Sequence, residues 1–132
     1  MLRKIAKVLG FLWAIPNTIV GLVAALACRS YPMCWSAKDM AWHCVASKWP
    51  SRRFCAITLG CVIVYRDVYI LADGTIVKHE LEHVRQGMIL GPLHFPIYGL
   101  LSLLALVLYC DIYHANLLEI GARNEAGEQA GW

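Results

Sequence analysis

Residues 54–90 decide the fold, and they read FCAITLGCVIVYRDVYILADGTIVKHELEHVRQGMIL. The first half of this stretch, residues 54–71, is rich in Ile, Val, Tyr and Thr, the residue types that favour strands. Arg66-Asp67 interrupts the apolar residues near the middle of that half. We therefore expect a short β-hairpin, with two strands joined by a turn at Arg66-Asp67.

The second half of the stretch has the features of a helix. Asp73-Gly74 is a turn pair that closes the second strand, and Thr75 after it is a residue type that caps helices. Gly91-Pro92 follows Leu90, and such a pair ends helices. We expect one helix from Thr75 to about Leu90.

This helix carries the pattern HExxH, as His79-Glu80-Leu81-Glu82-His83. Residues at positions i and i+4 share one face of a helix, so His79 and His83 can bind one zinc ion through both imidazoles. Glu80 lies beside them, where a carboxylate can take a proton from zinc-bound water. The competing interpretation is a solvated helix face, on which the charged neighbours are ordinary surface residues: Lys78, Glu82 and Arg85.

A catalytic zinc site needs a third protein ligand and an open fourth position. The metzincin pattern requires Gly and His at the positions of Gln86 and Ile89, so that class is excluded. The downstream candidates are His94, Asp111, His114, Glu119 and Glu125. We favour Glu119, because Gly121 and Ala122 follow it and small residues let its helix lie close to the HExxH helix. His114 is the rival.

Four stretches resemble the gluzincin metallopeptidases and, more closely, small membrane-associated HExxH proteins of bacteria and phages. They are residues 79–86 (HELEHVRQ), Leu90-Gly91-Pro92, residues 119–123 (EIGAR), and Pro16-Asn17-Thr18 in the first apolar run. The resemblance covers residues 60–126 and part of that first run, and it leaves out a Trp-rich segment between them.

The resemblance implies a set of zinc ligands and a general base: His79, His83 and Glu119 as ligands, with Glu80 as the base. Many gluzincins carry Asp where this chain has Arg123, and that Asp orients a zinc-bound His. We expect Arg123 to pair with Glu82 or Glu119, or the support for the histidines to come from elsewhere.

The first apolar run is long enough to cross a membrane. Residues 8–28 carry no charge, and a helix needs about 20 such residues to cross a bilayer. Pro16-Asn17 near the middle of the run predicts a kink. We favour a retained membrane helix over a cleaved signal peptide, although residues 25–28 (ALAC) are similar to a lipoprotein cleavage box. The basic residues before the run suit a cytoplasmic end: Arg3, Lys4 and Lys7.

Three tryptophans at seven-residue spacing mark the next segment. Trp35, Trp42 and Trp49 would lie near one face of a helix confined between Pro32 and Pro50. Basic residues surround them: Lys38, Lys48, Arg52 and Arg53. Trp with Lys and Arg suits a membrane surface, but the same stripe suits packing against the rest of the domain. Both interpretations stay open.

A second long apolar run follows the HExxH helix. A straight helix over residues 93–110 would be about 27 Å long and would carry Glu119 away from the HExxH histidines. We expect that helix to lie antiparallel to the HExxH helix, with residues 111–118 turning back. A helix broken at Pro96 and Gly99 is the alternative.

Composition narrows the class of protein. The 132 residues allow one compact domain, and they are 59% hydrophobic and 16% charged, against about half and a quarter in soluble domains. Disorder is excluded and a freely soluble monomer is disfavoured. The net charge of +3 gives no case for nucleic acid as a partner. Six cysteines without a CxxC pair give little support to a thiolate zinc site and leave disulfides open.

We therefore expect an α+β chain: a mostly helical, membrane-associated, zincin-like mini-domain with a short β-hairpin before the HExxH helix. Its expected parts are an N-terminal membrane helix (1–30), a Trp-rich interfacial segment (31–53) and a metallopeptidase core (54–132) that includes an apolar helix at 93–110. The expected location is a membrane, the bacterial inner membrane, with the lipid bilayer as a partner. Basic residues on both sides of the first apolar run leave its orientation open, and the sequence does not specify an oligomeric state.

The leading functional hypothesis is a zinc metallopeptidase of gluzincin type that hydrolyses internal peptide bonds. Its substrate would be a peptide or a membrane-protein segment, presented as an extended strand beside the hairpin. Oxyanion stabilisation would come from near the third ligand, where Tyr113, His114 and Arg123 are candidates. We assign Tyr98 to packing.

Two other functions stay in view. The first is a catalytically inactive membrane interaction protein, with a vestigial zinc site or a structural one closed by a fourth ligand such as His114. The second is a membrane-disrupting or assembly factor in which HExxH is accidental. The metal, if present, can also be another divalent ion that accepts imidazole and carboxylate ligands.

Overall fold

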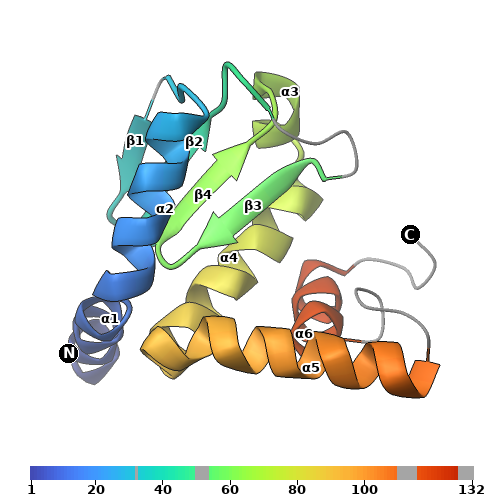
Figure 1. Cartoon of the computed structure of the whole chain (residues 1–132). Coiled ribbons are helices and arrows are strands. Elements are labelled where there is room, and N and C mark those ends of the chain that lie inside the picture. The colour runs from blue at the N-terminus through green and yellow to red at the C-terminus, as the bar shows by residue number, and fades with distance from the viewer. Residues whose placement is uncertain (32, 50–53, 110–115, 128–132) are drawn as a thin grey trace.

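Four short strands form one mixed sheet, and helices cover both of its faces (Figure 1). The computed structural model describes residues 1–31, 33–49, 54–109 and 116–127. The strands, in their order across the sheet, are β1 (Met33–Ser36), β2 (Ala41–Val45), β4 (Val62–Tyr65) and β3 (Ala56–Leu59). β1–β2 and β3–β4 are antiparallel pairs, while β2 and β4 run parallel. The expected mixture of helix and strand is confirmed.

β4 is the centre of the sheet, because all four of its residues are buried. Its sequence VIVY is a short apolar run of the kind that strands covered on both faces carry. Ile63 and Tyr65 face the core under α4 (Gly74–Leu90), whereas Val62 and Val64 face the core under α2 (Ile15–Ala27). The sheet therefore lies between α2 and α4.

The hairpin of β3 and β4 turns at Gly60-Cys61, so the predicted turn at Arg66-Asp67 is wrong. Gly60 has a φ of 62°, a left-handed conformation that suits glycine at tight turns. Asp67 instead caps α3 (Val68–Leu71), where its carboxylate accepts hydrogen bonds of 3.0 Å from the next helical backbone N–H groups. Arg66-Asp67 ends β4 because Asp67 caps the helix that follows.

The Trp-rich segment contains the hairpin of β1 and β2, so the predicted helix is wrong. Trp35 and Trp42 are cross-strand partners with ring centroids 5.4 Å apart, and such aromatic pairs stabilise sheets. Two residues seven positions apart are cross-strand partners in this hairpin, and in a helix they would lie about two turns apart. Trp42 and Trp49 pack against the core under α2, which agrees with the packing interpretation.

The first apolar run forms two helices, α1 (Leu2–Trp13) and α2, which meet at Ala14 with a bend of 65°. The expected kink exists, but it precedes Pro16, which lies in the first turn of α2, where a missing N–H has no consequence. The Asn17 side-chain amide donates to the Gly91 carbonyl at 2.6 Å. The Thr18 hydroxyl accepts from the Cys61 N–H at 3.1 Å. These bonds fix α2 to both the sheet and the end of α4.

Within the described residues, one helical run is long and apolar enough to cross a membrane. It extends from Gly74 to Leu108 through α4, the 3-10 turn η1 (Gly91–Leu93) and α5 (His94–Tyr109). The bent pair of α1 and α2 passes the same criterion only when counted as one span. Core helices of soluble proteins also satisfy this criterion, so it establishes length and composition alone.

α5 crosses α4 rather than lying along it, so the expected antiparallel pair is wrong (Figure 1). The alternative is wrong too, because α5 is continuous through Pro96 and Gly99. α6 (Leu117–Ala126) returns to pack on α4. This return brings the third candidate ligand back to the HExxH helix.

Candidate metal centre

The HExxH helix begins one residue before the predicted cap. Asp73 is the cap, and its carboxylate accepts from the N–H groups of Thr75 at 3.0 Å and Ile76 at 3.3 Å. The helix ends at Leu90, as predicted, and Gly91 leaves it with a φ of 56°. His79 and His83 therefore stand in the regular middle of α4, one turn apart.

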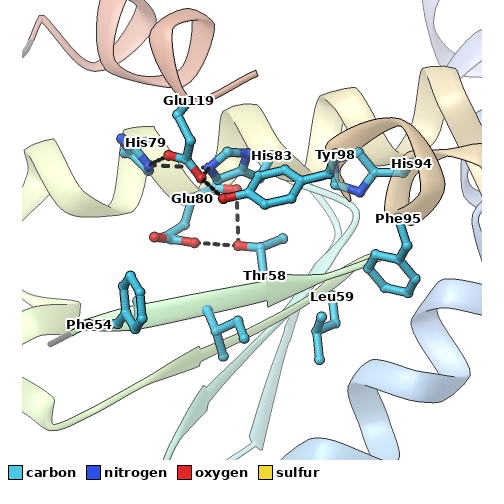
Figure 2. A pocket seen from close by; sticks show the side chains of 12 residues that line it. Phe54, Thr58, Leu59, His79, Glu80, His83, His94, Phe95, Tyr98 and Glu119 are labelled. Carbon is cyan, nitrogen blue, oxygen red and sulfur yellow. Dashed lines mark hydrogen bonds and ion pairs between the residues drawn. The ribbon is translucent and has the colours of Figure 1, made fainter. Parts of the chain in front are cut away.

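His79, His83 and Glu119 converge on one point, and all three are buried (Figure 2). His79 Nε2 lies 3.1 Å from Glu119 Oε2, and His83 Nε2 lies 3.3 Å from Glu119 Oε1. The two Nε2 atoms are 3.2 Å apart. In a tetrahedral zinc site with bonds of about 2.0–2.1 Å, donor atoms lie about 3.3 Å from one another. The three groups thus have the spacing of a metal site, and the predicted contact of Glu119 with both histidines is present.

Small residues allow this contact. Ala122 is fully buried, and a Cβ on Gly121 would lie 3.4 Å from the side-chain nitrogen of Gln86 on α4. The two helices are close because Gly121 and Ala122 place little or no side chain between them. Burial alone would raise the pKa of the Glu119 carboxyl, but hydrogen bonds from His79, His83 and Tyr98 outweigh it and hold that pKa below its usual range.

Two supporting residues were not foreseen from the sequence. Gln86 Oε1 lies 3.0 Å from His83 Nδ1, and the Gln86 amide donates to the Leu118 carbonyl at 2.9 Å. With Nδ1 bonded to Gln86, Nε2 is the nitrogen of His83 that faces the convergence point. The Tyr98 hydroxyl donates to Glu119 Oε1 at 2.6 Å, so its assignment to packing alone is wrong. Gln86 was detectable, because it lies three residues after His83 and so shares its helix face.

Glu80 is buried beside the three groups and points towards the sheet (Figure 2). The Thr58 hydroxyl on β3 donates to Glu80 Oε2 at 2.5 Å. This bond connects α4 to the edge of the sheet and fixes the carboxylate in one orientation. Glu80 therefore lies next to the candidate ligands, as predicted.

A cavity of about 220 Å³ lies against these groups. β3 and α5 form its other walls (Figure 2). Its remaining lining residues are Phe54, Ala56, Ile57, Thr58, Leu59, His94, Phe95 and Tyr98. Consecutive residues of one strand can all line a cavity only when the edge of the strand faces it, because side chains alternate between faces. Among the described residues β3 is an outer strand of the sheet, so the edge that faces away from β4 faces the cavity.

The other predicted site residues have different positions. Tyr113, His114 and Asp111 lie outside the described residues. Glu125 is exposed on α6. His94 lines the cavity but is not one of the three converging groups, and neither of its buried ring nitrogens has a hydrogen-bond partner in the described part of the chain.

Glu82 is ion-paired with a neighbour on its own helix. Its carboxylate accepts from Arg85 Nε at 2.9 and 2.8 Å. Arg123 is buried on α6, one turn after Glu119. Support for the ligands therefore includes Gln86 and Tyr98, which are different residue types from the gluzincin Asp.

We compared the chain with models of known protein families, with curated proteins and with solved structures, and found no match in any of the three.

Proposed function

We propose that the chain is a membrane-associated, zinc-dependent endopeptidase. One observation carries this proposal: two imidazoles and a carboxylate converge at metal-ligand spacing in the wall of a cavity that also holds Glu80. The group has three members among the described residues, which is the number that catalytic zinc sites use. The ligands would be His79, His83 and Glu119.

A zinc ion held there supplies a Lewis acid, which polarises a carbonyl group and makes water more acidic. Glu80 takes a proton from the attacking water as the water oxygen bonds to the peptide carbon. The same carboxyl then gives that proton to the amide nitrogen as the C–N bond breaks. Thr58 holds Glu80 in place for both transfers through its 2.5 Å hydrogen bond. Tyr98, whose hydroxyl reaches Glu119, keeps that carboxylate oriented.

The unpaired edge of β3 supports a peptide as the substrate. An extended peptide can add to such an edge through backbone hydrogen bonds, which recognise any sequence. Because β3 and the ligand helix α4 enclose the same cavity, an added strand would pass beside Glu80.

Exposed apolar side chains support contact with a bilayer. They cover α1 together with Arg3, Lys4 and Lys7, and they cover the outer side of α5. On α5 they are Leu100, Leu103, Leu104, Leu106, Val107 and Leu108. Apolar patches of this extent are typical of proteins that bind membranes or partners.

The first test is metal content after purification in detergent with zinc present. We expect about one zinc per chain in the wild type and in Glu125→Ala, which removes an exposed carboxylate from the helix that holds Glu119. Glu119→Ala and His83→Ala should lose the metal. A wild type without zinc would reject the proposal and favour an interaction protein.

The second test is cleavage of casein, an unfolded protein, by the zinc-loaded wild type. New peptide termini detected by mass spectrometry would support hydrolysis. Zinc without any cleavage would favour the interaction protein with a structural metal.

A further inference from the structure

The hydrogen-bonding pattern of β3 determines what its free edge offers. In antiparallel pairs, residues alternate between those that bond to the partner strand and those that point away from it. The Arg66 N–H donates to the Cys55 carbonyl at 2.8 Å, which makes Cys55 a bonded position. Ala56 and Thr58 therefore alternate with it and direct their backbone N–H and C=O groups to the outer edge. In an added antiparallel strand, the peptide residue opposite Thr58 would donate its N–H to the Thr58 carbonyl and accept a hydrogen bond from the Thr58 N–H.

Side chains alternate along the same strand. Ile57 and Leu59 pair with Val64 and Val62, whose side chains belong to the core under α2. Thr58 lies on the other face, where its hydroxyl meets the general base. In a strand added to this edge, two residues would lie beside Ile57 and Leu59, and the single residue between them would face the candidate metal centre.

The two outer positions have apolar surroundings. Ile57 is 45% exposed, so its side chain is available to a neighbouring strand. Leu59 and Phe95 line the cavity at the end where α5 begins, and Phe54 lines the opposite end (Figure 2). The carboxylates in the lining are Glu80 and Glu119, and both already have partners. A charged substrate side chain beside Ile57 or Leu59 would gain no charged partner there, whereas an apolar one would bury surface against these two side chains.

From this placement we propose that the cleft recognises extended peptides with large apolar side chains at two positions separated by one residue. The bond cut lies between those two positions. The inference rests on the proposed function for the cut, but the recognition of alternate apolar residues rests on β3 alone. Apolar strands emerging from a membrane have this chemistry.

Binding tests the recognition without any turnover. The probes are acetyl-Ala-Leu-Ala-Leu-Ala-amide and its isomer acetyl-Ala-Leu-Leu-Ala-Ala-amide, each with a fluorophore, added to the Glu80→Gln protein in detergent. We expect the alternating peptide to bind at least tenfold more tightly than the isomer, which has the same composition. Equal affinities would overturn the inference.

A substitution on β3 tests the register. Ile57→Glu places a carboxylate beside one outer position, and Val68→Glu makes the same change at an exposed site on α3 away from the cavity. In a peptide library digested by the wild type, we expect apolar residues at both outer positions. Ile57→Glu should shift one outer position to Lys or Arg by at least tenfold and leave the middle position unchanged, while Val68→Glu should match the wild type. A shift at the middle position, or no shift, would contradict the pairing.

These outcomes separate the inference from the proposed function. Cleavage without an alternating preference would leave the endopeptidase standing and remove the inference. Tighter binding of the alternating peptide by a protein that holds no zinc would keep the inference and remove the endopeptidase.

Discussion

Two histidine clusters in the described part of the chain, a half-buried one around His43 and the buried candidate metal centre, differ in how the ring nitrogens are used. At His43 each nitrogen has its own protein partner: Nδ1 lies 2.9 Å from the Tyr65 hydroxyl and Nε2 lies 3.3 Å from Asp39. At the candidate metal centre, the two Nε2 atoms lie 3.2 Å from each other. They lie 3.1 and 3.3 Å from the oxygens of one carboxylate, that of Glu119.

The hydrogen-bond partners of the two clusters explain the difference. Burial, then the nearby charges of Glu80 and Asp39, raise the pKa of Tyr65. The Tyr65 hydroxyl therefore stays protonated and donates a hydrogen bond to His43. With the Tyr65 hydroxyl donating to His43 Nδ1, the Nε2–H of His43 donates to Asp39, and both ring nitrogens have a partner. His79 and His83 instead share one carboxylate, Glu119, and a cation at that point would bind the lone pairs of both Nε2 atoms in place of these hydrogen bonds. The first cluster is complete in itself, and the second has the arrangement of a cation site.

The largest expected effect tests whether the second cluster is catalytic. Glu80→Gln keeps the size of the side chain and an acceptor for Thr58 but cannot take a proton. We expect turnover of casein to fall by a factor of about 10²–10⁴, with zinc content unchanged. Retained cleavage by this variant would contradict the proposed mechanism. Loss of zinc would show that Glu80 has a structural role instead.

The next effect compares the two clusters directly. Zinc at about 100 times its Kd should raise the free energy of unfolding by about 2.7 kcal/mol if it binds the folded state alone. We expect that increase in the wild type and in His43→Gln, and not in His83→Gln. Chemical denaturation in detergent with and without zinc gives the measurement. If His43→Gln also lost the increase, the comparison between the clusters would fail.

A smaller effect concerns the orientation of a ligand. Gln86→Leu removes the acceptor for His83 Nδ1, and we expect zinc affinity to fall about tenfold to a hundredfold. Gln86→Glu keeps that acceptor and is the matched control. Competition with a chelator measures both affinities, and an unchanged affinity in Gln86→Leu would assign Gln86 to helix packing alone.

The smallest effect is on stability. Neither buried ring nitrogen of His94 has a partner in the structure as described, so His94→Leu should raise the free energy of unfolding by about 1 kcal/mol. His43→Leu should lower it, because Tyr65 and Asp39 would lose their common partner. Denaturant titrations of both variants decide the sign. A decrease in both would mean that His94 is held in place by contacts of its own.

The parts of the molecule that were predictable depend on local spacing. His79, Glu80 and His83 were found because one helical turn sets their positions, and Glu119 was found because small residues follow it. The helix end at Leu90 followed from the glycine and proline after it. In each case the information lies within a few residues of the site.

The errors have a common cause, which is contact between distant segments. The seven-residue spacing of Trp35 and Trp42 fits a helix and a hairpin equally, and the parallel pairing of β2 with β4 decided between them. Tyr98 lies 21 residues before the carboxylate that it supports, so no local pattern indicates the contact. The turn at Gly60 was missed because a charged pair gave the stronger local signal.

The cover of β4 by α2 has a consequence for synthesis. Ala25 on α2 and Val62 on β4 share one core, but the ribosome adds Ala25 first. At about 5–20 residues per second, the wait between them lasts roughly 2–7 s. During that interval the apolar side of the nascent helix has no sheet to pack against. In the proposed membrane-associated protein, a nearby bilayer would bind that apolar side. Arrival at the membrane would then come before folding of the sheet, rather than after it.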